Sequence, residues 1–333
     1  MSNIQDMFEQ AQLAEAAYAD LTTAIGNQNT LKDVLNIANK SQYNGSFSTA
    51  QAAEFVKHWR VVNQYTASGG LLGQGSGFSA TVFESIDNPG QYSLAMRGTA
   101  GATDLLADAG DVLADGIALD QVVDMYNYWQ SLNTSGIYQA AKLETSLMET
   151  AALNLLLPGA ARDAAIAALK ASGAILDSTL GGLTIEVRRI VKGDSNILLV
   201  DTPLATGSGT FAVCPANLNV DGHSLGGHLA MAFSRLFPTA VSSVTAVNGA
   251  GFNFANSNVN ALFTALAGAP GFDANKITNI VGSAAMNVVS QDWLFLQQPA
   301  GRNEIYTESA FLENTLGHGA GQMTDSLAVY NLL

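Results

Sequence analysis

Charged residues are scarce in this sequence, and basic residues are scarcer than acidic ones. Charged side chains make up 13% of the 333 residues, with 14 Lys and Arg against 28 Asp and Glu, so the formal net charge is −14. With 48% hydrophobic residues, the chain lacks the composition of a disordered protein, which combines low hydrophobicity with high charge. The excess of acidic residues repels nucleic-acid phosphates, so we expect no nucleic-acid partner.

The sequence has a single cysteine, no long hydrophobic run and no pattern typical of a secretory signal peptide. Cys214 is the only cysteine, which excludes an internal disulfide and a cysteine-rich metal site. The most apolar stretch, residues 150–161, is too short to span a bilayer. The first ten residues, MSNIQDMFEQ, contain neither basic residues nor an apolar core of a secretory signal. We therefore expect no transmembrane segment, and either a cytoplasmic location or export by a route that needs no signal peptide.

Apolar residues recur with helical and strand periodicity along most of the chain. Helical spacing predicts helices over 4–21, from Ser48 through Phe55 and Trp59, over 104–132, over 141–178 and from about Thr324. Alternation predicts a hairpin of strands near 78–82 and 92–96, and further strands over 183–191, 196–201, 218–221 and from 277. Strands alternating with helices predict an α/β fold with a mostly parallel central sheet and helices on both faces. Because no linker or repeat divides the chain, we expect a single domain over residues 1–333.

The strongest chemical signal is a G-x-S-x-G motif between an apolar strand and an apolar helix. Residues 222–227 read Gly-His-Ser-Leu-Gly-Gly. A serine hydroxyl becomes a nucleophile when a tight turn exposes it and a base removes its proton, and small flanking residues permit such a turn. We interpret Ser224 as the nucleophile; the alternative is a glycine-rich structural turn.

A histidine downstream of Ser224 is needed as the base, because this motif occurs in proteins with the chain order Ser, Asp or Glu, His. Only His228 and His318 follow Ser224. His228 sits one turn into the helix after the nucleophile, where its ring cannot reach the exposed hydroxyl. We therefore predict His318 as the base, and expect His58 and His223 to pack or to face solvent.

The acid that orients the base is less well determined. Five acidic residues between Ser224 and His318 are candidates: Asp273, Asp292, Glu304, Glu308 and Glu313. Asp292 follows the apolar run that begins at Ile277, and such acids hang from loops after strands. We predict Asp292, with Glu308 and Asp273 as the next alternatives.

Acyl transfer also needs N–H donors for the oxyanion of the tetrahedral intermediate. The amide of Leu225, directly after the nucleophile, is one candidate donor. The second should follow an earlier strand, and Arg97-Gly98-Thr99 ends one. We predict Thr99 as the second donor; the alternative is an ordinary strand-to-helix turn.

These residues resemble those of a known family. Residues 96–99, Met-Arg-Gly-Thr, residues 104–108, Asp-Leu-Leu-Ala-Asp, and the motif at 222–227 resemble the class 3 lipases. They also resemble the lipase modules of bacterial exported calcium-dependent lipases, as do His318 and the Leu-Ala-Val-Tyr at 327–330. The resemblance implies an α/β-hydrolase fold, hydrolysis of carboxylic esters of lipids, Thr99 and Leu225 as oxyanion donors, and a mobile lid.

The long segment between Thr99 and Ser224 is where a lid would lie. Residues 133–205 are assigned to a lid or cap insertion, in which Leu155-Leu156-Leu157 stand beside a helix break at Pro158. Either this segment is a helical hairpin packed on the sheet, or it is a lid that opens at a lipid surface.

No cofactor is required for this chemistry. Four aspartates at helical spacing could attract Ca²⁺: Asp104, Asp108, Asp111 and Asp115. One helix face cannot surround an ion that takes roughly six to eight oxygen ligands, so a solvated acidic face is the preferred interpretation.

The sequence therefore predicts a serine ester hydrolase of the lipase or phospholipase A1 type, acting on a lipid or other ester at an interface. Two alternatives stay open. One is an esterase on small or polymeric esters without interfacial activation, and the other is a non-catalytic binding or toxin-accessory module with a relic site.

Overall fold

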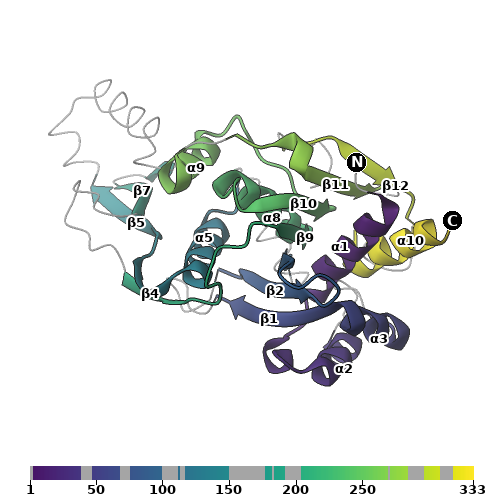
Figure 1. The fold of residues 1–333 in the computed structure, drawn as a ribbon. Helices are drawn as coiled ribbons and strands as arrows, with labels where there is room; N and C mark the ends of the chain where they lie inside the picture. Colours follow the sequence, from purple (N-terminus) through teal and green to yellow (C-terminus); the bar gives the residue numbers. More distant parts are fainter. Residues whose placement is uncertain are drawn as a thin grey trace. The chain divides into compact units, whose positions relative to one another are not determined.

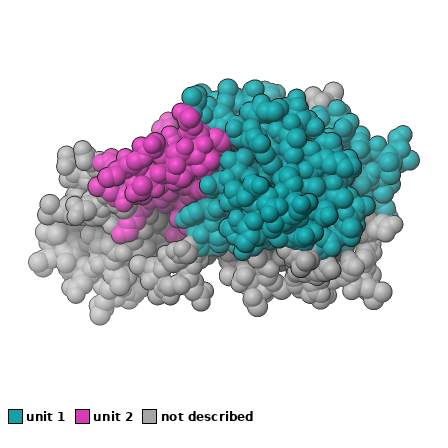
Figure 2. Space-filling view, turned by 60° about the horizontal axis from the view of Figure 1, so that its bottom comes forward, with its two compact units in different colours: residues 1–110, 213–252, 272–333 teal, residues 111–212, 253–271 magenta. Residues whose placement is uncertain are grey.

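The computed structural model describes residues 3–38, 47–67, 76–99, 112, 117–149, 177–181, 184–191, 204–268, 271–283, 296–307 and 318–333. The chain divides into two compact units, coloured separately in Figure 2. The first comprises residues 1–110, 213–252 and 272–333, and the second residues 111–212 and 253–271. The single domain and the insertion at 133–205 stay predictions.

The first unit is built on a seven-stranded mixed sheet in the order β1-β2-β3-β9-β10-β11-β12 (Figure 1). Its strands are β1 (Trp59–Thr66), β2 (Ser79–Ser85), β3 (Tyr92–Met96), β9 (Leu218–His223), β10 (Val241–Val247), β11 (Ile277–Gly282) and β12 (Arg302–Ile305). The pairs β1–β2 and β2–β3 are antiparallel, and each neighbouring pair from β3 to β12 is parallel. The predicted α/β fold with a mostly parallel sheet is confirmed, and the predicted hairpin is β2–β3.

Helices cover both faces of this sheet, as the side-chain alternation of β9 shows. Asp221 faces α1 (Ile4–Ala16), where the Gln10 amide nitrogen donates to both carboxylate oxygens at 2.9 and 2.8 Å. The next residue, Gly222, faces α8 (Leu225–Leu236): a Cβ there would lie 2.1 Å from the Gly226 carbonyl oxygen. Because successive residues of a strand point to opposite faces, α1 and α8 lie on opposite sides of β9. The C-terminal helix α10 (Ala320–Leu332) packs beside α1 (Figure 1).

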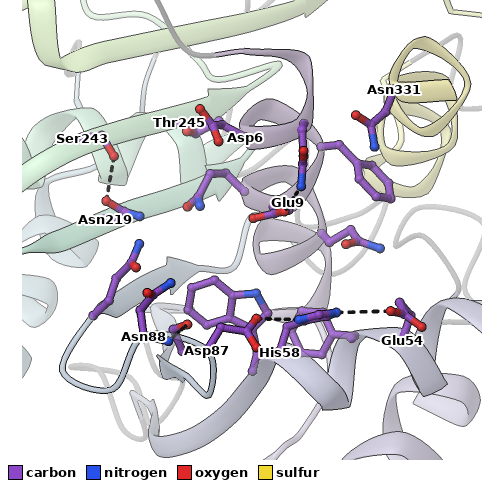
Figure 3. Close-up of a pocket in the computed structure, with 18 residues that line it drawn as sticks. Asp6, Glu9, Glu54, His58, Asp87, Asn88, Asn219, Ser243, Thr245 and Asn331 are labelled. Atoms are coloured by element: carbon purple, nitrogen blue, oxygen red, sulfur yellow. Dashed lines mark hydrogen bonds and ion pairs between the residues drawn. The ribbon is translucent and has the colours of Figure 1, made fainter. Parts of the chain in front are cut away.

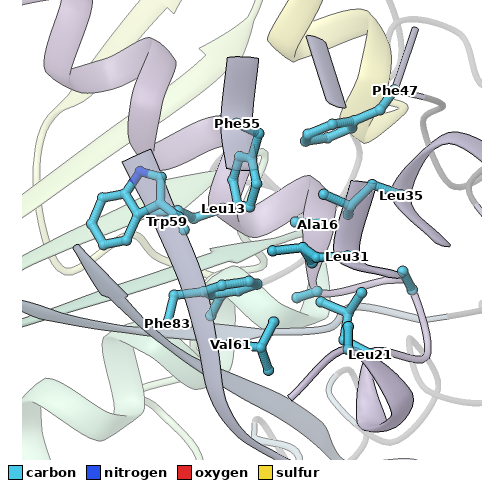
Figure 4. Close-up of a cluster of buried hydrophobic side chains, with 14 of the residues drawn as sticks. Leu13, Ala16, Leu21, Leu31, Leu35, Phe47, Phe55, Trp59, Val61 and Phe83 are labelled. Atoms are coloured by element: carbon cyan, nitrogen blue, oxygen red, sulfur yellow. The ribbon is translucent and has the colours of Figure 1, made fainter. Parts of the chain in front are cut away.

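Two further helices follow α1 along the chain and close the core over the antiparallel part of the sheet. These helices are α2 (Gln28–Ala38) and α3 (Thr49–His58). Two short 3₁₀ helices in the described residues span Thr22–Ala24 and Ala274–Lys276. Buried side chains from α1, α2, α3, β1 and β2 form one cluster (Figure 4). Phe55 at its centre contacts Phe47 and Phe83 edge to face, at centroid distances of 5.5 and 5.6 Å. Edge-to-face pairs stabilise a core beyond the area they bury.

The structure corrects two expectations in this region. The helix predicted over 4–21 ends at Ala16, because the next residues turn so that Tyr18 points into the protein. The helix predicted from Ser48 is confirmed, with a capping box between Ser48 and Gln51, but it ends at His58. Trp59 does not share a helical face with Phe55; it begins β1, paired with Ser85.

The second unit contains helices and two small sheets. Its elements are α5 (Leu119–Asn133), β4 (Ser135–Gln139), β5 (Lys142–Glu149), β6 (Asp177–Gly181), β7 (Thr184–Val191), β8 (Leu204–Ser208) and α9 (Ser257–Ala267). β4 pairs with β8, and β5, β7 and β6 form a second antiparallel sheet. Of the helices in the described ranges, none is long and apolar enough to cross a membrane.

The prediction of a helix over 141–178 was wrong for residues 142–149 and 177–178, which are strands. Leu143 and Leu147 stand four apart, which suits a helix, but residues four apart also lie on one face of a strand. The β-branched run of β7 is paired with β5, with Leu143 opposite Ile190. This long-range pairing overrides the local helical spacing. Residues 150–176 and the strand predicted over 196–201 lie outside the described residues.

A buried carboxyl group lies between α1 and α10. Glu15 on α1 is 1% exposed, and its carboxyl group lies near Thr324 and Asp325 of α10. Burial raises its pKa to about 8, the nearby Asp325 acts in the same direction, and Thr324 opposes the shift. Glu15 is therefore protonated in the folded protein at neutral pH but ionised in the unfolded chain.

We expect Glu15→Gln to stabilise the protein at pH 8–9 and to change its stability little near pH 4. The folded-state pKa lies above the unfolded one, so wild type loses stability as the pH rises from about 4.5 to about 8. A neutral amide of the same shape removes this loss. Thermal unfolding of both proteins between pH 4 and 9 measures the difference.

The matched control is Glu9→Gln on the same helix, because Glu9 is less buried than Glu15. If the difference in melting temperature between wild type and Glu15→Gln is the same across this pH range, the ionisation of Glu15 does not cause the loss of stability at high pH.

Candidate functional site

Ser224 occupies a sharp turn between β9 and α8. Its backbone has φ 58° and ψ −122°, in the left-handed half of conformational space that costs a non-glycine residue free energy. The turn is held from both sides: the Ser224 N–H donates to the Val247 carbonyl at 2.9 Å, and the Ser224 carbonyl accepts from Ala250 at 3.2 Å. Ser224 itself is only 4% exposed. The strand and helix predicted around the motif are both present.

Small residues let α8 approach the sheet closely at this turn. A Cβ on Gly226 would lie 2.1 Å from the Met96 carbonyl oxygen at the end of β3. A Cβ on Gly227 would lie 2.7 Å from the Gly249 Cα, in the loop after β10. Both are contacts with backbone atoms, which cannot move aside. The motif therefore requires glycines for packing as well as for the turn.

His318 stands next to the Ser224 hydroxyl. Its Nε2 lies 2.8 Å from Ser224 Oγ, and the residue precedes α10 by two positions. Burial lowers the pKa of His318 to about 4, so the ring is neutral at neutral pH and able to accept a proton. The structure thus brings together the serine and histidine that the sequence singled out.

The described structure narrows the acid candidates. Asp273 precedes β11, and its side chain accepts from the Asn275 N–H. Because β9, β10 and β11 are parallel, the start of β11 lies at the opposite end of the strands from Ser224. Glu304 is exposed on the edge strand β12. Asp292, Glu308 and Glu313 lie outside the described residues, so Asp292 stays a prediction. In sequence, Asp292 follows β11 and Glu308 follows β12. These are the strand ends that share an edge with the end of β9.

Asp221 is a buried acid that does not fill this role. It lies on β9 before Ser224 and is fully buried. Its carboxylate accepts from the Ser93 hydroxyl at 2.6 Å and from Gln10. Burial raises its pKa to about 8, against hydrogen bonds from Ser93 and Thr245. These contacts tie β3, β9, β10 and α1 together.

The loop after β3 lies directly beside the serine. A Cβ on Gly98 would be 3.3 Å from Ser224 Cβ and 2.4 Å from the His223 carbonyl oxygen, so only glycine fits. Thr99, the predicted second donor, is the next residue. Leu225 is the first residue of α8, and the first N–H groups of a helix have no carbonyl partner within the helix. Both predicted donors therefore belong to segments that border Ser224.

Three residues around His318 were missed by the sequence reasoning. These are Tyr18, His223 and Asn248, all of them buried. The Tyr18 hydroxyl contacts His223 Nδ1, and both His223 Nε2 and Asn248 Nδ2 contact the His318 carbonyl oxygen. His223 was expected only to pack or face solvent. The one available signal was its place in the motif. Side chains alternate along a strand, so His223 faces the same side of the sheet as Asp221, which is the side of α1.

The other two histidines behave as expected. His228 is fully buried, its ring stacks on Phe252, and its Nδ1 contacts the Gly251 carbonyl at 3.1 Å. His58 is half-exposed and bridges Glu54 and Asp87, whose carboxylates raise its pKa.

His58 belongs to a polar pocket of about 700 Å³ that is separate from Ser224 (Figure 3). The pocket lies between the first half of α1, the end of α3 and the starts of β9 and β10, with Asn219 and Ser243 among its lining residues. Neither Ser224 nor His318 lines it. Its carboxylates at Glu54 and Asp87 are already paired with His58 (Figure 3).

The structure offers no metal centre among the residues it describes: no group of three or more His, Cys, Asp or Glu there could hold an ion. The aspartates at 104, 108, 111 and 115 lie outside the described residues, so the interpretation of these four residues stays a prediction.

Comparison with known proteins returns lipases among solved structures. The Lip2 lipase from Yarrowia lipolytica aligns over 90% of this chain and 78% of that chain, with 14% identity and a TM-score of 0.37. M37 lipase aligns over 99% and 91%, with 11% identity and a TM-score of 0.35. A triacylglycerol lipase from Penicillium expansum aligns over 93% and 81%, with 15% identity and a TM-score of 0.34. Such loose superpositions carry no inference about activity. No protein-family model matches the sequence, and no curated protein matches it significantly.

We expect any activity that depends on His318 as a base to persist in mildly acidic solution. The protonated ring is inactive, so activity falls as the pH drops through the His318 pKa, which burial lowers from about 6.5 to about 4. The pH dependence of kcat/KM for a water-soluble ester, measured from pH 4 to 8, should show its acid limb well below pH 6.5. A limb at or above 6.5 would contradict the assigned environment of His318.

Proposed function

We propose that this chain is a carboxylic ester hydrolase that forms an acyl-enzyme on Ser224. The observation that carries the proposal is the contact of 2.8 Å between His318 Nε2 and Ser224 Oγ, made at a serine whose strained backbone lies in a strand-to-helix turn. A neutral imidazole at this distance is the arrangement that activates a serine.

The proposed reaction is an acyl transfer in two steps, and His318 moves a proton in each of them. His318 Nε2 takes the Ser224 proton as Oγ attacks the ester carbonyl carbon. The resulting oxyanion is stabilised by the N–H groups of Leu225 and Thr99. When the intermediate collapses, the C–O bond to the alcohol breaks and His318 gives its proton to the leaving alcohol. Water, deprotonated by His318, then attacks the acyl-enzyme, and the departing Ser224 oxygen recovers the proton.

The third member of the triad is proposed to be Asp292, which would accept from His318 Nδ1 and stabilise the imidazolium. Support for Asp292 comes from the sequence, in which it follows β11, a strand whose end lies at the same edge of the sheet as the end of β9. Glu308 is the alternative, because in sequence it follows β12, which ends at that edge as well.

The substrate class is proposed to be lipid esters, as in a lipase or a phospholipase A1. Support comes from the resemblance of the motifs at 96–108 and 222–227, and from the three consecutive leucines at 155–157 in a segment with few charges. A lid with such residues would cover Ser224 in water and open at an interface, because exposing each leucine to water costs about 1.5–3 kcal/mol.

Ser224→Ala should fold like wild type and lose essentially all esterase activity, since a triad member accounts for several orders of magnitude in kcat. The measurement is hydrolysis of a water-soluble p-nitrophenyl ester, together with labelling by a fluorophosphonate probe and mapping of the labelled peptide. Ser234→Ala is the matched control, because Ser234 lies on the same helix with its hydroxyl bonded to the Met231 carbonyl. Wild type that neither turns over nor accepts the probe would identify a relic site instead of an enzyme.

The lipid proposal predicts a rise in turnover when a long-chain ester passes from monomers to micelles or emulsion. An ester series of increasing chain length, followed across each solubility limit, measures it. Leu156→Asp should weaken this rise more than it slows hydrolysis of a short-chain ester, because a charge on the lid disfavours contact with lipid. Smooth saturation with no change at the solubility limit would leave an esterase without interfacial activation.

A further inference from the structure

The Tyr18 hydroxyl connects three segments around the proposed site. It lies 2.8 Å from His223 Nδ1, inside the protein, with only 9% of the residue exposed. It also takes part in a backbone hydrogen bond with Gly98, in the loop that leads to Thr99. Tyr18 follows α1 and is distant in sequence from both partners. One hydroxyl thus joins the N-terminal segment, the loop after β3 and the motif at 222–227.

The His318 carbonyl oxygen sets the direction of the hydrogen bonds that run from Tyr18 through His223. His223 Nε2 contacts the carbonyl oxygen of His318, which only accepts, so Nε2 carries the hydrogen. In a neutral ring Nδ1 must then accept, and the Tyr18 O–H donates to it. Burial lowers the pKa of His223 to about 3, and the neighbouring His318 acts in the same direction, so the ring stays neutral. The His318 carbonyl thus sets this tautomer of His223, and the Tyr18 hydroxyl stabilises it by donating to Nδ1.

That tautomer holds the backbone of the proposed base. The His318 carbonyl accepts from His223 Nε2 and, at 3.3 Å, from Asn248 Nδ2. Asn248 is itself fixed: it is fully buried, and its Oδ1 accepts from the Gly282 N–H at 3.0 Å. The two donors come from the ends of neighbouring strands β9 and β10. They hold the peptide of His318, whose ring must stay 2.8 Å from Ser224 Oγ.

We propose that Tyr18 and His223 are positioning residues: Tyr18 locks His223 as its Nε2–H tautomer, and His223 fixes the His318 backbone so that the imidazole stays aligned with Ser224. This inference rests on the proposed function of Ser224 and His318. In the other tautomer, a lone pair of His223 would face the His318 carbonyl and repel it.

The hydrogen bond from Tyr18 to His223 also helps to keep His223 neutral when His318 becomes positively charged. The ring centroids of His223 and His318 are 5.0 Å apart. When His318 becomes an imidazolium, a second charged ring at that distance would oppose it. Donation from Tyr18 to Nδ1 occupies the position at which His223 would otherwise take up a proton.

The first test is Tyr18→Phe, which removes only the hydroxyl. We expect kcat for a water-soluble ester to fall about tenfold with KM nearly unchanged, the size expected for one lost buried hydrogen bond felt in the transition state. The rate of fluorophosphonate labelling should fall similarly. Tyr92→Phe is the matched control, because Tyr92 begins β3, at the opposite end of that strand from Gly98. Equal activity of Tyr18→Phe and Tyr92→Phe overturns the positioning role.

Substitutions of His223 separate positioning from packing. His223→Gln keeps an N–H near the position of Nε2 and should retain most activity, whereas His223→Leu fills similar space without a donor and should lose more than tenfold. Adding Tyr18→Phe to His223→Leu should cost less than Tyr18→Phe costs in wild type, because the bond from Tyr18 to His223 is already lost and only the contact with Gly98 remains to be removed. Thermal unfolding checks each variant. Equal loss in the Gln and Leu variants at equal stability, or additive losses in the double variant, overturns the proposal.

A measurement independent of turnover reports the tautomer itself. In protein labelled with ¹⁵N-histidine, the nitrogen shifts of His223 should show a hydrogen on Nε2 in wild type and a mixture of tautomers in Tyr18→Phe, with assignment from His223→Gln. An unchanged tautomer in Tyr18→Phe overturns the lock. A wild type that is inert to esters and to the probe refutes the proposed function, whereas an active wild type with an unaffected Tyr18→Phe refutes the positioning role alone.

Discussion

The backbone strain at Ser224 is the constraint on which the rest of the first unit depends. A non-glycine residue at φ 58° costs of the order of 1–3 kcal/mol and persists only where its surroundings hold it. Here β9 pairs with β3 and β10 on its two sides, and α8, buried along its whole length, presses its first turn against both neighbouring strands. The sheet must be complete on both sides of β9 for this turn to survive. The loops after β3 and β10 then meet at Ser224.

The α1 face of the sheet carries several buried polar groups. Gln10 binds the Asp221 carboxylate, Glu15 is buried against α10, and Tyr18 just beyond the helix reaches His223. Buried polar groups stabilise a structure only when their partners are in place, and each leaves a penalty when one partner is removed. Gln10 and Tyr18 have such partners in the contacts described. Glu15 instead avoids burying a charge, because its raised pKa keeps the carboxyl group protonated at neutral pH. The N-terminal segment is therefore coupled to the site through specific bonds as well as through apolar packing.

Local sequence signals were reliable where a single segment decides the outcome. The capping box at Ser48 begins α3, the turn between β2 and β3 makes the predicted hairpin, and the glycines of 222–227 lie where bulkier side chains would strike backbone. Two expectations failed where distant pairing decides. Residues 142–149 have the spacing of a helix, yet they are paired with β7, and Trp59 leaves its helix to begin β1. The free energy of such pairing depends on a partner that no local window contains.

By itself the sequence determined the α/β class with its mostly parallel sheet, the nucleophile candidate Ser224 and, by elimination among four histidines, His318. These follow from period, motif and chain order, which are local or countable properties. Only the tertiary structure decided that His318 lies 2.8 Å from Ser224, that Asp273 stands at the start of β11 and Glu304 is exposed on β12, and that His223 and Asn248 contact the His318 carbonyl while Tyr18 contacts His223. The physical reason is that hydrogen bonds between residues far apart in the chain have no spacing signature: Tyr18 and His223 meet because α1 and β9 pack together, and nothing in either segment alone records the other.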